Sequence, residues 1–489
     1  MLDLSVVIPT YNGADRLLRC LDSLSRQTLA ADSYETIVVV DGSTDNTAQT
    51  LAQLNTPFRL VVIEQRNQGP GAARNAGITA AQATYCVFLD DDIIAHPQLL
   101  AEHLRVQRAG AAVVGLGAIP TVVPSRAGWL ARRFAEYSND HRAKLARGVR
   151  PAGWRDCYSG NMSIARADFL SIGGFATDMR RGEDVELGYR LSERGLSFVY
   201  IPGAVGTEQQ RKGMPELVSD FEANAVAAAE IYRRHPRTLQ SVIPDFSAPG
   251  TGSVRMRRLL LSTGVPPRVL GSLRPPSGKK SWGQAWYGFI HSYCYWRGLR
   301  RGLADPQSWW QLTHSTPILS YRAGEAADQP EDRHLVPIHR FARQMRWLDW
   351  AGYQVLSLDQ YLQYQRECRL PPKRSIGIIL DEGHRDAYAS AEPLLRRYGH
   401  PVAAYGAPGK AAGTNDSEGE RGRNRLPLGG GVNNHRTPPE ALYQTEIQES
   451  DSLLQFAWKV WRASSGTPRP RERSSLLRVV RRRLSQVTR

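Results

Sequence analysis

The sequence predicts an α/β fold in which helices pack around a parallel, doubly wound sheet in the first half of the chain. Strand-like runs of β-branched and aliphatic residues alternate with helix-like segments from residue 4 onward. Three of these runs end in polar residues: Thr10, Asp41, and the triplet Asp90, Asp91 and Asp92. Open α/β sheets bind ligands at the carboxyl ends of their strands, so we expect the site at this edge.

The expected elements follow one another closely. Leucines recur at helical spacing over residues 14–27, and Ser43 or Thr44 is placed to cap a helix that ends near Leu54. A glycine-spaced stretch at 69–77 allows a close backbone approach and opens another helix. The expected strands cover residues 4–9, 36–40, 59–63, 85–89 and 159–164.

The acidic triplet is the strongest chemical signal. Three adjacent carboxylates repel one another unless a cation lies among them, and oxygen ligands suit a hard ion such as Mg2+ or Mn2+. The alternative is a solvated acidic turn, which is the commoner fate of an aspartate cluster. The apolar strand at 85–89 leads directly into the cluster and favours the metal.

A second acidic pair, Glu183 and Asp184, stands at the start of a predicted helix. Val185, Leu187 and Leu191 are expected to pack inward from it. Carboxylates in a first helical turn are stabilised by the helix dipole, so capping is the structural alternative to a catalytic role for this pair.

Composition limits the partners and the compartment. The 489 residues are enough for two to four domains, and the net charge of +16 suits anionic partners such as nucleotide diphosphates or an acidic membrane surface. Five scattered cysteines with no C-x-x-C pair favour a reducing compartment. The N-terminus has no basic region typical of a signal peptide, and no apolar run reaches 18 residues. We therefore expect a cytoplasmic protein.

Residues 4 to about 215 resemble family 2 glycosyltransferases, which have the type A (GT-A), Rossmann-like nucleotide-diphospho-sugar transferase fold. Each matching segment is weak alone, but their order and spacing are specific. The segments are SVVIPTYNG from Ser5, VVVDGSTDNT from Val38, NQGPGAARNAG from Asn67, FLDDD from Phe88, GNMSIAR from Gly160, and GGF from Gly173 followed by GEDVELGYRL from Gly182.

The resemblance implies roles for single residues. It implies contacts to the nucleoside from Thr10, Tyr11 and Asp41, with Arg74 nearby. Asp90 and Asp91 would hold the ribose and the metal, Asp92 would be the main ligand of Mg2+ or Mn2+, Asp184 the general base and Glu183 the group that orients the acceptor. Such an enzyme moves a sugar, with inversion, from a nucleotide-diphospho-sugar to a glycan or lipid-linked acceptor. Its role would lie in cell-envelope or exopolysaccharide synthesis, without a nucleic-acid partner.

One departure from the family concerns the metal. Many relatives place a histidine after the last strand, where this chain has Thr207 and Glu208. Either Glu208 or water would then complete the metal shell. Arg211 and Lys212 are alternative contacts for the diphosphate, or else a solvated basic turn.

Residues 317 to about 408 are similar to polysaccharide deacetylases. The similarity rests on PILSY from Pro317, a helical stripe of Phe341, Met345 and Leu348, and a strand that ends in Asp381 and Glu382. Active relatives carry two aspartates there and an H-x-x-x-H pair, which is missing here. We therefore expect a partial, inactive module, in the form of a truncated (β/α) barrel fragment.

The expected domains are a glycosyltransferase at 1–240, a connector with an aromatic-rich helix at 241–310, the deacetylase-like part at 311–412, and a disordered basic tail at 413–489. Residues 469–489 carry eight arginines and one glutamate, and the tail could touch an anionic membrane, although a solvated tail is the preferred alternative. Two other functions remain open. The chain could be a bifunctional transferase and deacetylase, or a non-catalytic scaffold that binds sugar nucleotides or glycans.

Overall fold

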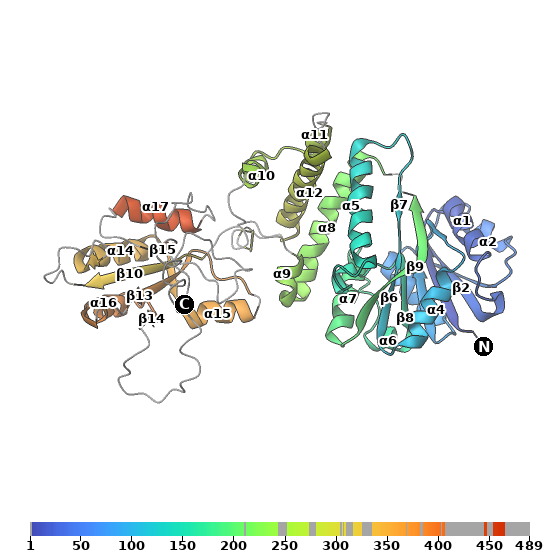
Figure 1. The fold of residues 1–489 in the computed structure, drawn as a ribbon, viewed down its shortest axis with the longest axis horizontal. Coiled ribbons are helices and arrows are strands. Elements are labelled where there is room, and N and C mark those ends of the chain that lie inside the picture. Colours follow the sequence, from blue (N-terminus) through green and yellow to red (C-terminus); the bar gives the residue numbers. More distant parts are fainter. Residues whose placement is uncertain are drawn as a thin grey trace, which may run out of the picture. The chain divides into compact units, whose positions relative to one another are not determined.

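Figure 1 shows the chain as a computed structural model, which divides into two units. The first unit comprises Met1–Ile231 and Val265–Gly302, and the second comprises Tyr232–Gly264 and Leu303–Arg489. The structure describes residues 2–209, 212–242, 252–272, 280–303, 306, 308–309, 316–324, 335–367, 369–381, 385–401, 403–405, 445–446 and 453–464.

A nine-stranded sheet forms the centre of the first unit (Figure 1). Its order is β3-β2-β1-β4-β8-β6-β9-β5, with β7 paired to β9. The strands are β1 (Leu4–Thr10), β2 (Tyr34–Asp41), β3 (Arg59–Gln65), β4 (Tyr85–Leu89), β5 (Ile93–Ala95), β6 (Val113–Ala118), β7 (Thr121–Val122), β8 (Asn161–Ala165) and β9 (Ser197–Gln209).

The sheet is parallel only in part. Strands β3, β2, β1 and β4 run parallel, as expected, and bring their carboxyl ends to one edge. Strand β8 then pairs antiparallel with both β4 and β6, which corrects the expectation of a parallel, doubly wound sheet. Residues 159–164 form a short run that mixes polar and apolar side chains and has the same composition in either direction, so sequence pattern alone does not reveal the reversal.

Helices cover both faces of this sheet. Leucines of α1 (Ala14–Leu24) and α4 (Leu99–Ala109) pack against one face, and α3 (Pro70–Ala80), α6 (Arg166–Ser171) and α7 (Glu183–Glu193) pack against the other. Helix α2 (Thr47–Ala52) adds the buried Leu51 to the first face. The β-branched strands are therefore buried from both sides, as expected for the middle of an α/β sheet.

Three further helices complete the first unit: α5 (Trp129–Ala146), α8 (Met214–Arg234) and α12 (Lys280–Gly302), with the short α11 (Pro267–Ser272). Phe221 of α8 contacts the rings of Tyr287 and His291 of α12 and of Phe134 of α5. The aromatic-rich helix expected near 282–301 is thus α12, and its aromatic residues pack as core side chains.

The second unit has its own six-stranded sheet, in which every described pairing is parallel. Phe341, Met345 and Leu348 are fully buried in its core, as the expected helical stripe requires. Its strands are β10 (Ile318–Gly324), β11 (Leu335–Pro337), β12 (Gln354–Leu356), β13 (Ser375–Asp381), β14 (Ala403–Tyr405) and β15 (Thr445–Glu446), and its helices are α9 (Leu239–Val242), α10 (Gly252–Thr263), α14 (Ile338–Trp350), α15 (Leu358–Arg366), α16 (Arg385–Arg397) and α17 (Leu453–Ser464).

Among the described residues, no helix combines the length and the apolar character needed to cross a membrane. The basic tail at 469–489 and most of the region expected to be disordered lie outside the described residues.

Candidate active site

The carboxyl ends of β2, β1 and β4 meet at a cleft of about 460 Å3. Because these strands are parallel neighbours, the polar residues that follow them share one edge of the sheet. The cleft is lined by Pro9, Thr10, Tyr11, Arg16, Asp41, Asn67, Gly69, Pro70, Arg74, Asp90, Asp91, Asp92 and Arg180. This set includes the seven residues to which the resemblance gives contacts with the nucleotide-sugar or the metal, whereas Glu208 and Lys212 are not in it. The seven are Thr10, Tyr11, Asp41, Arg74, Asp90, Asp91 and Asp92.

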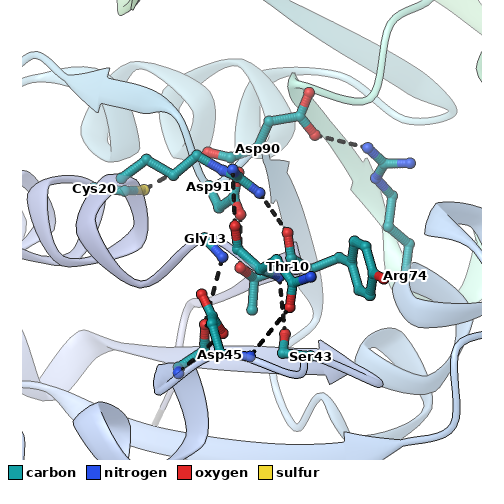
Figure 2. A network of polar contacts seen from close by, with 12 residues as sticks. Thr10, Gly13, Cys20, Ser43, Asp45, Arg74, Asp90 and Asp91 are labelled. Atoms are coloured by element: carbon teal, nitrogen blue, oxygen red, sulfur yellow. Dashed lines mark hydrogen bonds and ion pairs between the residues drawn. The ribbon is translucent and has the colours of Figure 1, made fainter.

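Asp91 is held inside the protein by the end of β1 and the start of α1. Its carboxylate accepts hydrogen bonds from the Thr10 hydroxyl at 2.6 Å and from Arg16 Nε at 2.7 Å (Figure 2). Arg16 also donates to the carbonyl oxygens of Tyr11 and Asn12. Burial raises the pKa of Asp91, and the bonds from Arg16 and Thr10 partly oppose that effect. Asp91 therefore fixes the loop at 10–13, whereas Tyr11 is 48% exposed to the cleft.

Asp90 points away from Asp91 and toward Arg74 (Figure 2). Arg74 lies on α3 and is 5% exposed; its Nη2 donates to Asp90 at 2.6 Å and its Nη1 to Glu183 at 3.0 Å. Its Nε is buried without a hydrogen-bond partner. One arginine thus joins the acidic end of β4 to the acidic start of α7.

Helix α7 begins at Glu183, directly after Gly182, whose φ of 73° lies in the left-handed region that favours glycine. The N-cap residue of α7 is Gly182, which has no side chain with which to cap the helix. Glu183 is buried against Arg74, and Asp184 accepts only from the Val185 amide among the described residues. Burial, followed by repulsion from Glu183, raises the pKa of Asp184 to about 7.

Asp92 faces the cleft and has no hydrogen bond or ion pair to any described residue. The pKa of Asp92 is raised to about 7, chiefly because the protein removes water from around the carboxylate and secondly because the charges of Asp90, Glu208 and Asp91 repel it. Glu208 lies on β9 opposite Ile93, the residue after Asp92, and its pKa is also raised, chiefly by burial. Strand β9 thus brings a carboxylate beside the acidic triplet.

Asp41 supports the loop between β3 and α3. Its carboxylate accepts from Gln65 Nε2 at 2.7 Å and from the amides of Gln68 and Gly69 at 2.8 Å. It lines the cleft but is 4% exposed. The contact to the nucleoside that the resemblance implies for Asp41 would therefore come from a side chain that already holds Gln65, Gln68 and Gly69 in place.

Asn12 connects the loops after β1 and β2. It adopts a φ of 46°, its side-chain oxygen accepts from the Thr44 amide at 2.7 Å, and its own backbone amide donates to Ser43 Oγ at 3.1 Å. Ser43 and Thr44 therefore do not cap α2, which corrects that expectation. The N-cap of α2 is Asn46, which makes no side-chain capping bond, and Asp45 just before it accepts from the Thr47 amide at 3.1 Å.

The basic residues after β9 are only partly described. Arg211 lies outside the described residues. Lys212 Nζ pairs with Asp220 of α8 at 2.7 Å, and Asp220 also binds Arg181 at 2.9 Å. In this structure Lys212 therefore neutralises a carboxylate of its own chain.

Sequence reasoning missed three residues at the site: Arg16, Asn12 and Arg180. Arg16 lies one turn into α1, where an arginine ordinarily reads as a solvated helix residue. The Y-N-G turn gave the only signal for Asn12, because asparagine tolerates a positive φ. Nothing in the sequence distinguishes Arg180 from its neighbour Arg181.

No group of three or more histidine, cysteine, aspartate or glutamate side chains in the described parts of the chain is arranged to hold a metal ion. Asp381, proposed as a vestigial deacetylase residue, ends strand β13, and its predicted partner Glu382 lies outside the described residues. Asp381 of β13 and Glu446 of β15 thus stand at strand ends of the six-stranded sheet.

The sequence was compared with protein families and with curated proteins. The sequence model of glycosyl transferase family 2 matches residues 5–172. Validoxylamine A glucosyltransferase of Streptomyces hygroscopicus subsp. jinggangensis is 32% identical over 289 residues, which cover 52% of this chain and 67% of that protein. Poly(ribitol-phosphate) beta-glucosyltransferase of Bacillus spizizenii is 42% identical over 103 residues, 20% of this chain and 16% of that protein.

A comparison with solved structures found the mannosyltransferase PcManGT of Pyrobaculum calidifontis, in complex with GDP-Man and Mn2+. It matches with a TM-score of 0.41 and 20% sequence identity, over 62% of this chain and 88% of that one.

Proposed function

Because the chain belongs to glycosyl transferase family 2, we propose that its first unit transfers a sugar from a nucleotide-diphospho-sugar to a hydroxyl group of a glycan or lipid-linked acceptor. The observation that carries this proposal is the 460 Å3 cleft, which gathers the implied nucleotide and metal residues at one sheet edge. Its first unit is the α/β layer structure expected of such a transferase.

We assign the general base to Asp184. A general base works best when its pKa lies near the working pH, and the raised pKa of Asp184, about 7, meets that condition. Its carboxylate would take the proton as the acceptor oxygen attacks the anomeric carbon. One displacement without a covalent intermediate inverts the configuration. Glu183 would orient the acceptor through the shared contact with Arg74.

The residues at the end of β4 fit a divalent ion. Asp92 is a carboxylate among like charges that has no partner in the described part of the chain, and oxygen donors suit Mg2+ or Mn2+. Asp92 and Asp90 would hold the ion, with Glu208 as a third candidate. When bound, the ion would supply positive charge for the departing diphosphate. Asp91 would act indirectly, by fixing the loop that carries Thr10 and Tyr11.

We place the reaction in polysaccharide or cell-envelope synthesis. The Bacillus spizizenii relative, a poly(ribitol-phosphate) beta-glucosyltransferase, supports this context. A peripheral contact between the basic tail and an anionic membrane would suit a lipid-linked acceptor.

For the second unit we retain the proposal of a partial, inactive deacetylase-like module. Its parallel sheet and the acid at the end of β13 support the proposal. A working deacetylase would instead bind one zinc ion per chain, which metal analysis after dialysis would detect. Stoichiometric zinc that is lost in Asp381→Ala would favour the bifunctional reading.

The full chain tests the transferase proposal directly. Release of UDP or GDP from UDP-glucose, UDP-N-acetylglucosamine and GDP-mannose would be measured with Mn2+ or Mg2+ for wild type, Asp92→Ala and Asp184→Asn. We expect both variants to lose at least 100-fold in turnover, and only Asp92→Ala to weaken metal-dependent nucleotide binding. Asp32→Asn, an exposed carboxylate outside the cleft, is the control and should behave as wild type.

Two results would overturn parts of the proposal. If wild type binds nucleotide but never turns over any donor, the protein is a scaffold rather than a transferase of these sugars. If Asp184→Asn keeps full activity, the base has been assigned to the wrong residue.

A further inference from the structure

Two charged side chains that line the cleft have no partner among the described residues: Asp92 and Arg180. The other charged residues of the lining are engaged. Arg16 binds Asp91, Arg74 binds Asp90, and Asp41 accepts three hydrogen bonds from the adjacent loop. The two unpartnered groups have opposite charges, and they do not pair with each other.

Arg180 is exposed, but the backbone around it is anchored. Met179 on one side is buried at 6% exposure. Arg181 on the other side donates to Asp220 at 2.9 Å and to Asn224 at 2.6 Å, both on α8. The segment that leads into α7 is therefore held on both sides of Arg180. The two adjacent arginines differ: one fastens the segment to α8, and the other lines the cleft.

A ligand that satisfies both free groups must present an anion to Arg180 and bring a cation to Asp92. A diphosphate that carries a divalent ion meets both requirements. Arginine suits this contact because its planar, permanently charged guanidinium can donate two parallel hydrogen bonds to phosphate oxygens. The basic residue beyond β9 that is described, Lys212, is bound to Asp220 and so is engaged within the protein.

We propose that Arg180 is the cationic contact for the diphosphate of the nucleotide-sugar donor. This inference rests on the proposed transferase function and adds a binding residue to it. The proposal assigns to Arg180 the contact with the diphosphate that the sequence suggested for Arg211 and Lys212. As the leaving nucleotide gains charge during transfer, the same contact would stabilise it.

The test is nucleotide binding by the full chain, measured by calorimetry for wild type, Arg180→Gln, Arg180→Lys and Arg19→Gln. Arg19 is an exposed arginine of α1 outside the cleft lining, and it controls for the loss of one positive charge. The probes are UDP and GDP, their monophosphates and their nucleosides, each in EDTA and in Mn2+. Thermal unfolding checks that every variant is folded.

We expect Arg180→Gln to weaken UDP or GDP binding at least ten-fold, with a smaller loss for the monophosphate and less than two-fold for the nucleoside. The loss should appear in EDTA as well, because it does not depend on the ion. Arg180→Lys should recover part of the affinity, since it keeps the charge but not the paired donors. Because Arg180 is exposed, the difference in diphosphate affinity between Arg180→Gln and wild type should shrink at about 0.5 M salt. Salt at this concentration shortens the Debye length well below its value of about 10 Å at 0.1 M and so screens exposed charges.

Other outcomes would overturn the inference. Equal diphosphate binding by Arg180→Gln and wild type would leave Arg180 as a solvated surface residue. An equal loss for nucleoside and diphosphate would mean that Arg180 shapes the base pocket instead. If donor binding is unchanged but the KM for a phosphorylated acceptor rises, the anion belongs to the acceptor. A wild type that binds none of these nucleotides would refute the transferase proposal itself, and this inference with it.

Discussion

Replacing Arg74 with methionine tests the idea that one buried cation holds the two acidic parts of the site together. Arg74 is 6% exposed at its side chain and pairs with Glu183, which is 8% exposed, and with Asp90, which is 41% exposed. Methionine fills the space of the arginine stem without its charge. The substitution leaves Glu183 buried without its partner, whereas Asp90 can be hydrated.

The expected cost follows from that difference in burial. Removing one partner of a buried ion pair costs about 3–5 kcal/mol, because the remaining charge is uncompensated. Nearly all of this cost should come from Glu183. Adding Glu183→Gln to Arg74→Met should therefore restore at least about half of the lost stability, and adding Asp90→Asn should restore little.

Urea unfolding of the full chain at pH 7.5, with hydrogen exchange of peptides from β4 and α7, would measure these changes in the first unit. Arg26→Met is the matched control, since it breaks a pair with Asp22 in which the side chains are 58% and 65% exposed. Its cost should stay below about 1 kcal/mol. A loss under about 1 kcal/mol for Arg74→Met, or equal rescue by Asp90→Asn and Glu183→Gln, would refute the reasoning.

Three further predictions concern the acidic groups and one glycine. A general base must be ionised to act, so the raised pKa of Asp184 places the acid limb of the kcat/KM profile near pH 7. Glu183→Gln removes a repelling charge from beside Asp184, and a pH-rate profile should show this limb at lower pH. Asp92 is ionised in the folded protein only above about pH 7 but in the unfolded chain above about pH 4. Its ionisation therefore destabilises the metal-free fold increasingly across that window, and Asp92→Asn should stabilise it by about 1 kcal/mol at pH 8, a figure discounted for solvent screening, and by nothing below pH 4 in urea unfolding. Gly182→Ala should lower the free energy of unfolding by about 2 kcal/mol, because Gly182 has a φ of 73° and an added Cβ would lie 3.0 Å from the Ala227 Cβ. Gly148→Ala should lower it less, because Gly148 has a similar φ of 66° but open space around it. Equal shifts in thermal unfolding for the two variants would contradict this prediction.

The strands and the cleft lining were largely predictable from the sequence. Buried strands such as β4 leave a continuous apolar run, and the residues after them must lie at the shared edge once the strands are parallel. This placed Thr10, Asp41 and the acidic triplet together without knowledge of any distance. The start of α7 was also predictable, but from a different signal, because Gly182 and the two acids after it mark a helix N-terminus.

The remaining features depend on which long-range partner a side chain chooses. The sequence cannot show that Asp90 turns to Arg74 while Asp91 turns to Arg16 and Thr10, because the two aspartates are chemically identical neighbours. The antiparallel direction of β8 and the link from Asn12 to the loop after β2 are likewise settled by packing between distant segments. The roles assigned to the site residues stay predictions until they are measured.

The packing of α12 on α8 affects how the chain can be divided. Gly298 and Gly302 lie so close to α8 that a Cβ on Gly298 would be 2.2 Å from the Glu222 carbonyl oxygen. Ile290, Tyr293 and Leu299 of α12 are buried. A fragment that stops at residue 240 would therefore leave the α8 surface bare and prone to self-association. The catalytic part of this protein is discontinuous in sequence, and the shortest fragment that retains its full core ends near residue 302.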